Sequence, residues 1–214
     1  MQNKPLILIG GGGHCKSVID VAESAGYTIL GILDKTELFG TSVLAYKVMG
    51  TDDDIPQYVD KAEFVITVGQ IKSSTLRRKL ALLVKNAGGK LATIVAPDAH
   101  VSKYAEIGEG TVVMHKAVVN TGAKIGTNCI INTMANIEHD VQVGDFCHVS
   151  TGTMVNGDCI IGNRCFIGSQ SVLSNGITVC DDAIIGAGSY VNDSICTNGV
   201  FIGSPVKLIN RQII

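Results

Sequence analysis

The 214-residue sequence predicts a small α/β, Rossmann-like domain over residues 1–92 and an all-β left-handed parallel β-helix over residues 93–214. Two observations carry this prediction. The first ninety residues alternate short apolar runs with amphipathic helical patterns, as in a parallel sheet with helical crossovers. From Val95 onward, apolar residues recur at every sixth position, which is the period of a hexapeptide-repeat β-helix.

Composition and charge argue against several other classes of protein. A formal net charge of −2 gives no general attraction for nucleic acid or for an anionic membrane. No apolar run is long enough for a signal peptide or a membrane span, so we expect a cytoplasmic protein without membrane insertion. The seven cysteines lack CxxC spacing, so neither a disulfide framework nor a zinc knuckle is indicated.

The α/β domain is expected to contain three parallel strands and two helices. Apolar runs predict strands at Lys4–Ile9, Tyr27–Leu33 and Phe64–Val68, and helical spacing predicts helices at His14–Ala25 and Ser73–Asn86. This order implies right-handed crossovers, with ligands bound beyond the carboxyl ends of the strands.

Four consecutive glycines, Gly10–Gly13, follow the first strand and precede His14. Such a turn suits a phosphate, because bare backbone N–H groups and a helix N-terminus can both point at the anion. The spacing does not match the dinucleotide fingerprint, since Cys15 and Lys16 stand where its third glycine would be needed. A tight turn without a ligand is the alternative.

Two charged residues, Asp34 and Lys35, follow the second predicted strand. An acidic residue at this edge of the sheet can reach a ribose or a base. Ordinary loop charges remain the alternative for both positions.

The repeat region contains seventeen hexads, from Val95 to Cys196, without a slip in register. The first position is always Val, Ile or Leu, and the fifth is mostly small. The large residue is expected to point inward beside the small one, and small or Asn-like residues at the second position are expected to adopt the corner conformation. Four cysteines occupy the fifth position and are expected to be packing residues: Cys129, Cys147, Cys159 and Cys165.

His139 and His148 occupy positions of their hexads that do not point inward. The uncharged stretches beside them suggest a surface buried between subunits, so the two histidines are expected to border a site at that interface. Asp140 could orient the His139 imidazole, and a histidine with a pKa near neutrality can remove a proton from an amine or a hydroxyl. A plain solvated histidine is the alternative.

Together, the GGGGH turn, the short sheet domain and the uninterrupted hexads resemble the sugar O- and N-acyltransferases. This family includes sialic-acid O-acetyltransferases and N-acetyltransferases that act on nucleotide-linked 4-amino-4,6-dideoxy sugars. NTMANIEHDVQVGDFCHVSTG, from Asn132 to Gly152, resembles the catalytic segment of the family. NGVFIGSPVKLI, from Asn198 to Ile209, resembles the segment that caps the last coil.

The resemblance implies a role for each candidate residue. His139 would be the general base and Asp140 would orient it, while His148 and the Gly157 backbone N–H would bind acetyl-CoA. Asn132 would contact the acceptor sugar. The nucleotide part of the acceptor would be bound by six residues of the first domain: Gly11, Gly12, Gly13, His14, Asp34 and Lys35.

The expected activity is therefore acetyl transfer from acetyl-CoA to a nucleotide-linked 4-amino sugar, UDP-linked by preference, in bacterial glycan biosynthesis. The resemblance implies a homotrimer without a metal. Lys35 and Gln70 depart from the residues common in the family, Asp and Asn, and bear on acceptor choice. The alternatives are sialic-acid O-acetylation, a non-catalytic nucleotide-sugar-binding subunit, and a zinc carbonic anhydrase using His115, His139 and His148.

Overall fold

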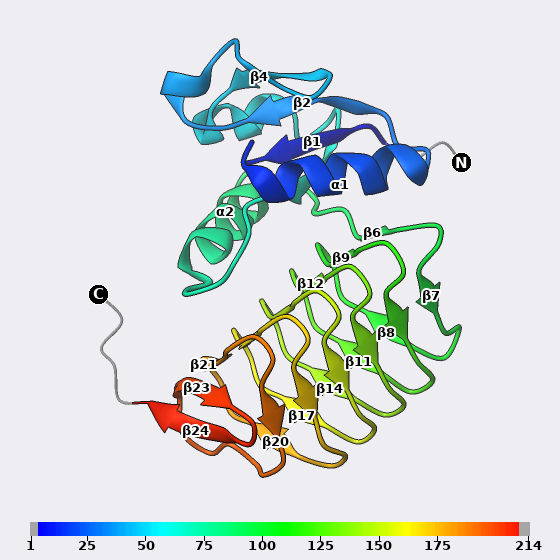
Figure 1. The fold of residues 1–214 in the computed structure, drawn as a ribbon. Helices are drawn as coiled ribbons and strands as arrows, with labels where there is room; N and C mark the ends of the chain where they lie inside the picture. Colours follow the sequence, from blue (N-terminus) through cyan, green and yellow to red (C-terminus); the bar gives the residue numbers. More distant parts are fainter. Residues whose placement is uncertain (1–3, 210–214) are drawn as a thin grey trace.

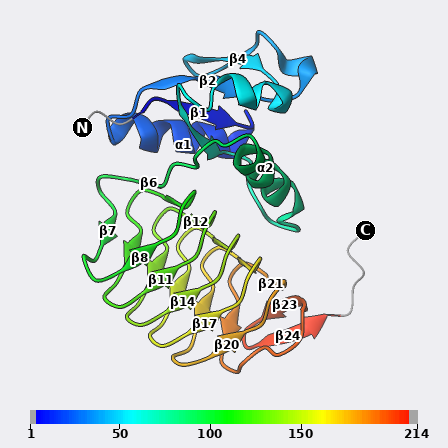
Figure 2. The same ribbon diagram turned by 180° about the vertical axis from the view of Figure 1, so that it is seen from behind.

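The computed structural model describes residues 4–209 and stacks an α/β domain on the first coils of a parallel β-helix (Figures 1 and 2). The sheet of the α/β domain has the order β3-β4-β2-β1-β5. Four of its strands are parallel, and β3 pairs antiparallel with β4 at one edge. The strands are β1 (Leu6–Ile9), β2 (Ile29–Leu33), β3 (Ser42–Val43), β4 (Tyr46–Gly50) and β5 (Glu63–Ile66).

Two α-helices cover the sheet, α1 (Gly13–Ser24) and α2 (Thr75–Asn86), and both agree with the predicted helices to within two residues. α1 is followed by Gly26 at φ +76°, a conformation that favours glycine just beyond a helix end. The sequence analysis did not predict the β3–β4 hairpin or the 3-10 helices η1 (Thr36–Leu38) and η2 (Asp52–Gln57).

The β-helix consists of two-residue and three-residue strands, each hydrogen-bonded to a strand one coil away. This spacing of 18 residues confirms that three hexads make one coil, as in the pair Val118 and Asn136. The strands are β6 (Ile94–Val95), β7 (His100–Val101), β8 (Glu106–Ile107), β9 (Val112–Val113), β10 (Val118–Val119), β11 (Lys124–Ile125), β12 (Ile130–Ile131), β13 (Asn136–Ile137), β14 (Gln142–Val143), β15 (His148–Val149), β16 (Met154–Val155), β17 (Ile160–Ile161), β18 (Phe166–Ile167), β19 (Val172–Leu173), β20 (Thr178–Val179), β21 (Ala183–Ile185) and β22 (Tyr190–Val191).

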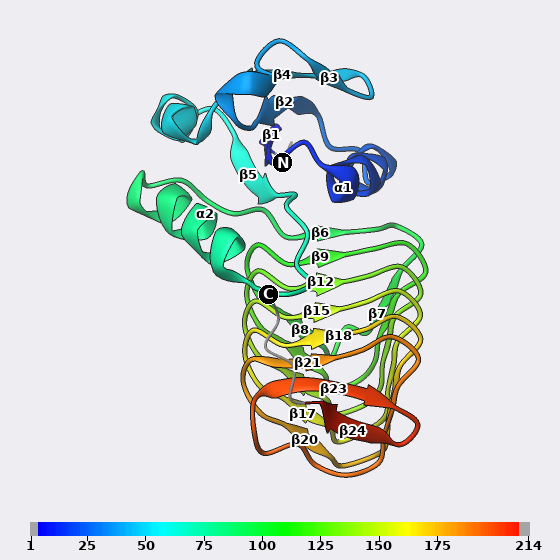
Figure 3. The ribbon, with the colours of Figure 1, turned by 60° about the vertical axis from the view of Figure 1, so that its left-hand side comes forward.

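These strands form three sheets, which are the faces of the prism. We call the sheet β6-β9-β12-β15-β18-β21 the first face, β7-β10-β13-β16-β19-β22 the second face and β8-β11-β14-β17-β20 the third face. Figure 3 shows the first face, below the α/β domain and beside α2. A hairpin of β23 (Gly199–Gly203) and β24 (Val206–Ile209) extends the first face over the last coils, at the predicted capping segment.

The predicted hexad register is confirmed by burial. The first position of every hexad from Val113 to Val191 is buried, and the small fifth-position residues fill the space beside it. All four predicted packing cysteines, Cys129, Cys147, Cys159 and Cys165, are buried, are not in disulfides, and donate thiol hydrogen bonds to main-chain carbonyls of the following coil. Their predicted packing role is therefore confirmed.

The expectation that the second position adopts the corner conformation is wrong. Positive φ values occur at the fourth position instead, as at Lys116 (59°) and Asp140 (60°). The second-position glycines are needed for space: a Cβ on Gly144 would stand 2.7 Å from the Asn163 side-chain oxygen and 2.8 Å from the Asn163 backbone nitrogen. Coil-to-coil contact therefore selects glycine at this position.

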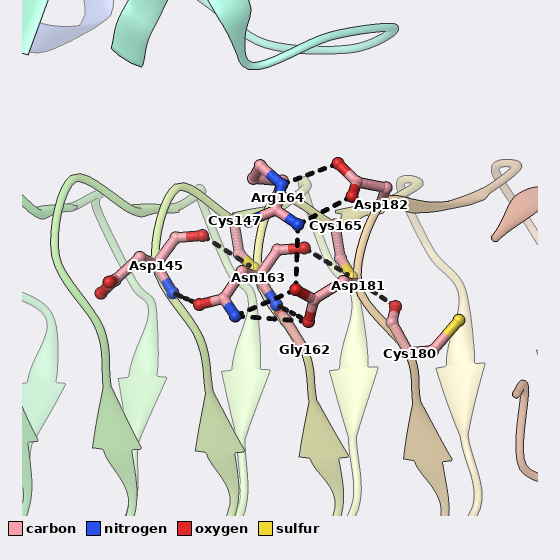
Figure 4. Close-up of polar contacts among 9 residues, drawn as sticks. All are labelled: Asp145, Cys147, Gly162, Asn163, Arg164, Cys165, Cys180, Asp181 and Asp182. Atoms are coloured by element: carbon pink, nitrogen blue, oxygen red, sulfur yellow. Dashed lines mark hydrogen bonds and ion pairs between the residues drawn. The ribbon is translucent and has the colours of Figure 1, made fainter. Parts of the chain in front are cut away.

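A ladder of side chains uses the space that these glycines leave (Figure 4). The backbone N–H of Asp145 donates to Asn163 Oδ1 (2.9 Å), and that of Asn163 donates to Asp181 Oδ1 (2.8 Å). Arg164 continues the ladder by bonding both Asp181 and Asp182. Each of these carboxylate or amide oxygens thus satisfies a corner N–H of the preceding coil.

The α/β domain and the first coils share a hydrophobic core. Ile94, Val112 and Met114 of the β-helix pack with the buried face of α1, including Val18 and Ala22. This shared core fixes the α/β domain over the first coils of the β-helix. None of the helices in the described part of the chain is long and apolar enough to cross a membrane.

Candidate active site

His139 and Asp140 lie at the corner between the second and third faces, in the turn from β13 to β14. The left-handed conformation of Asp140 (φ 60°) folds its carboxylate back, and Oδ2 lies 3.0 Å from His139 Nδ1. This hydrogen bond is the main cause that raises the pKa of His139 above its ordinary value. With Nδ1 engaged, and with 52% of the side chain exposed, Nε2 is the ring nitrogen available to a substrate.

Gly157 lies one coil further along and directly below the His139 ring. A Cβ on Gly157 would stand 2.5 Å from both Cε1 and Nε2 of the imidazole, so only glycine leaves the ring in place. Among the described residues, nothing accepts a hydrogen bond from the Gly157 backbone N–H. The corner therefore combines a proton acceptor with a neighbouring free donor, as acyl transfer requires.

His148 is placed differently from the expectation. It is 7% exposed, on the first face, and packs edge-on against Phe166. Its Nδ1 lies 2.6 Å from the Gln70 backbone carbonyl, and its Nε2 lies 3.0 Å from Asn132 Nδ2. Burial lowers the pKa of His148 to about 4, so the ring is neutral at pH 7.

Within one subunit, His139 and His148 therefore lie apart, and the expectation that they border one site between subunits stays a prediction. The loop after β5 covers His148, a contact between residues 78 positions apart that the hexad pattern does not show. Asn132 joins His148 and not His139. The His139 corner and this domain junction lie on different parts of the prism.

Some backbone N–H groups in and beside the glycine turn are already hydrogen-bonded within the protein, and others are not. Asp34 accepts hydrogen bonds from the N–H of Gly11 (2.5 Å) and of Lys35 (2.7 Å). Asp34 thus shapes the turn, in addition to the ribose or base contact expected of it. The N–H groups of Gly12 and Gly13 have no acceptor among residues 4–209, and the space above both glycines is open.

His14 connects the glycine turn to the domain junction. Its Nε2 is buried and has no hydrogen-bond partner among the described residues. Burial, with smaller contributions from Arg77 and His148, lowers the pKa of His14 to about 3. The ring is therefore an uncharged group at the base of the turn.

The sequence analysis missed the role of Arg77. Its side chain is 1% exposed, and it donates to the backbone carbonyls of Ile66, Val68 and Asn128, which joins α2 and β5 to the β-helix. The available signal was its helical spacing with Leu80 and Val84, which places an arginine on the buried face of α2.

The three histidines of the zinc alternative have separate surroundings. His115 lies between Asp20 and Asp98, at 3.1 and 2.7 Å, whereas His139 and His148 occupy the corner and the junction. Within residues 4–209, His139, Asp140 and Asp158 place one possible ligand atom each within 4.8 Å of one another, but all three are exposed. Exposed acidic clusters of this kind are common without an ion, so we assign no metal.

Comparisons with known proteins match both parts of the chain. Residues 5–81 match the PglD N-terminal domain. Residues 140–175 match the bacterial transferase hexapeptide (six repeats), and residues 159–193 match the hexapeptide repeat of succinyl-transferase. Comparison with curated protein sequences gave no match.

Among solved structures, the perosamine N-acetyltransferase from Caulobacter crescentus, in complex with CoA and GDP-perosamine, is 31% identical, with 97% of each chain covered and a TM-score of 0.91. The acetyltransferase domain of PglB from Neisseria gonorrhoeae is 32% identical, with 97% of this chain and 100% of that chain covered and a TM-score of 0.89. The same domain has been solved in complex with acetyl coenzyme A. WeeI from Acinetobacter baumannii, at 22% identity and a TM-score of 0.86, shares the fold.

Proposed function

Since the chain belongs to the sugar O- and N-acyltransferase family of hexapeptide-repeat enzymes, we propose that it acetylates the 4-amino group of a nucleotide-linked 4-amino-4,6-dideoxy sugar. The acyl donor is acetyl-CoA, the co-substrate of this family. The observation that carries the proposal is the corner at which Asp140 holds His139 above the free N–H of Gly157.

His139 acts as the general base in this proposal. The sugar amine attacks the thioester carbonyl carbon, and its proton passes to Nε2 of His139 as the new C–N bond forms. The C–S bond then breaks, and the proton leaves with the CoA thiolate as a thiol. Asp140 supports the step because its hydrogen bond keeps Nδ1 protonated and Nε2 free to accept.

Gly157 stabilises the negative charge that develops on the thioester oxygen. Its N–H is fixed by the main chain of the β-helix, so it needs no reorganisation during the reaction. Direct attack requires only that both substrates are held close together, and no covalent acyl-enzyme is involved.

The glycine turn binds the diphosphate of the acceptor. The uncommitted N–H groups of Gly12 and Gly13 begin α1, whose first turn carries no acidic residue that would repel an anion. Gly11 and Asp34 hold the turn in shape, Lys35 lies at the same edge, and His14 forms the base of the site. UDP is our first choice of nucleotide, and GDP is the nucleotide of the Caulobacter relative.

A homotrimer would bring the two halves of the site together. The outward strand residues of the second face include no Asp, Glu, Lys or Arg and are mainly apolar, among them Val118, Met154, Val172 and Tyr190. Packing of this face against a neighbouring subunit would bury it and could bring the His139 corner of one chain to the junction of another. Acetyl-CoA would then lie between subunits, with His148 and Asn132 near its acetyl end and the sugar.

The test is a thermal-shift panel of UDP-, GDP- and CMP-linked 4-amino sugars, followed by acetyl transfer to the sugar that binds best. We expect thiol release and a product whose acetyl group survives mild alkali, because an amide is stable where an ester is cleaved. An alkali-labile product on a sialic acid would point to O-acetylation instead. Binding without thiol release from acetyl-CoA would indicate a non-catalytic subunit.

A further inference from the structure

A chain of hydrogen bonds crosses the junction between the α/β domain and the β-helix. His148 Nδ1 lies 2.6 Å from the backbone carbonyl of Gln70, and His148 Nε2 lies 3.0 Å from Asn132 Nδ2. The chain ends where the backbone N–H of Thr133 meets Asn132 Oδ1 at 2.8 Å. One chain of hydrogen bonds thus joins three segments that are remote in sequence.

The main chain fixes the direction of every hydrogen bond along this path. A backbone carbonyl can only accept, so His148 Nδ1 must carry the proton that Gln70 receives. At the other end a backbone N–H can only donate, so Oδ1 of Asn132 must face Thr133 and Nδ2 must face the imidazole. Nε2 of His148 is therefore the acceptor, and the ring is the neutral Nδ1–H tautomer.

We propose that Gln70 is a positioning residue, whose carbonyl holds His148 as the Nδ1–H tautomer and thereby makes Asn132 a hydrogen-bond donor in the acceptor site. One Nδ2 hydrogen of Asn132 is used by His148, which leaves the second for a ligand. A fixed donor selects an oxygen acceptor, such as a hydroxyl or ring oxygen of a sugar. This last step rests on the proposed function, whereas the tautomer does not.

Gln70 is itself held by contacts with the β-helix. Its side-chain Nε2 donates to the Phe146 carbonyl at 2.7 Å. Two residues earlier in the same loop, the Val68 carbonyl accepts from Arg77 at 2.6 Å, and Arg77 also bonds the Asn128 carbonyl at 3.0 Å. These contacts pin the loop after β5 to the first face, so the carbonyl that His148 needs has a defined position.

The same loop lies where a ligand of the sheet would bind. It follows the carboxyl end of β5, next to β1 and its glycine turn, and Gly69 lies beside His14. A nucleotide on the turn would therefore lie close to the residue that orients His148 and Asn132. Gln70 thus links acceptor binding in one domain to side-chain orientation in the other.

The charges around His148 favour the neutral ring. Arg77 is the cation that faces it, His14 is the second imidazole at the junction, and Asn132 and Gln70 supply uncharged partners. Burial is the largest influence and lowers the pKa of His148, the hydrogen bond to the Gln70 carbonyl raises it, and Arg77 lowers it further. The balance favours the neutral ring, and the hydrogen bonds select its Nδ1–H tautomer.

The direct test is nitrogen-15 NMR of histidine-labelled protein at pH 7, with His148 assigned by its loss in His148→Asn. We expect a protonated Nδ1 and an unprotonated Nε2. A protonated Nε2 in the wild-type protein would overturn the proposal. Because no substrate is present, this result does not depend on whether the proposed function is correct.

Gln70→Ala tests the positioning role, since it removes the tether to Phe146. We expect the second tautomer to appear in the His148 signals, while Lys72→Ala, an exposed change in the same loop, leaves the spectrum unchanged. If the His148 signals of Gln70→Ala are the same as in the wild type, Gln70 does not position His148 and the proposal is wrong.

Asn132→Asp tests the donor, because it replaces the amide by a carboxylate of equal size that can only accept. Nε2 should then gain a proton, so His148 titrates at a higher pH than in the wild type. We expect kcat/KM for the nucleotide sugar to fall about tenfold to a hundredfold, the usual effect of losing a buried donor. Asn86→Asp, an exposed change of equal charge at the end of α2, should alter neither. An unchanged His148 titration in Asn132→Asp would contradict the proposal.

Discussion

The His139 imidazole lies directly over the backbone of Gly157, so that a Cβ at residue 157 would stand 2.5 Å from the ring Nε2. The two residues are one coil apart, and the parallel pairing of coils therefore fixes their separation. The proposed base and the free backbone donor are thus placed by the fold itself, and no flexible loop has to bring them together.

Gly157→Ala should inactivate the enzyme without unfolding it. The added methyl would meet the exposed end of the His139 side chain, which can move aside at little cost in stability. We expect kcat to fall about a hundredfold, as for other displaced catalytic groups, with an unchanged melting temperature. The check is thiol release from acetyl-CoA beside differential scanning calorimetry. Wild-type turnover in this variant would show that the contact has no catalytic role.

Asp140→Asn should move the pH dependence of the reaction. Asp140 raises the pKa of His139, and the general base works only when neutral, so activity increases as the pH rises through that pKa. Removing the carboxylate lowers the pKa of His139, and the rising limb of kcat should shift to lower pH. The plateau rate should also fall, because the amide orients the ring less firmly. If the rising limb of the kcat–pH profile stays in place in Asp140→Asn, His139 is not the base whose titration controls the rate.

Gly13→Val should weaken binding of the nucleotide sugar but not of acetyl-CoA. Nothing lies within 4 Å of the position that its Cβ would occupy, so the free protein should accept the change. A bound diphosphate would occupy that space, and Kd should rise at least tenfold. The matched control is Ser17→Val, which places the same side chain at an exposed position further along α1. Equal losses for both substrates by calorimetry would refute the assignment of the turn.

Gly144→Ala should destabilise the β-helix. Its Cβ would stand 2.8 Å from backbone atoms of the next coil, which cannot move independently, and we expect a loss of at least about 3 kcal/mol in the free energy of unfolding. Gly188→Ala is the control, because its surroundings are open and only its positive φ (66°) opposes a side chain. That strain costs about 1–2 kcal/mol. Denaturant unfolding measures the free energy of unfolding of both variants. Equal losses in the two would contradict the claim that coil-to-coil contact requires glycine at residue 144.

The hexad pattern determined most of what could be predicted about the β-helix. Its inward residues are set by a strict local period, and Val113 and Ile137 are buried as that period requires. The error about the corners has a local cause as well. The hexad pattern assigns a conformational role to small second-position residues, whereas the contact that demands glycine at positions such as Gly144 and Gly162 comes from the next coil.

The candidate site could be predicted only where its parts are close in sequence. His139, Asp140 and the coil that carries Gly157 follow from the repeat. The junction does not, because His148 and Gln70 are 78 residues apart and meet only after the α/β domain has folded onto the first face. The same holds for Arg77, whose acceptor on the β-helix is the Asn128 carbonyl.

The central claim, that His139 is the base of acetyl transfer, is tested most directly by steady-state kinetics of His139→Ala with the best nucleotide amino sugar. We expect kcat to fall about two to four orders of magnitude, the usual contribution of a general base, while both substrates still bind and the oligomer persists. Turnover at the wild-type rate in this variant would contradict the account.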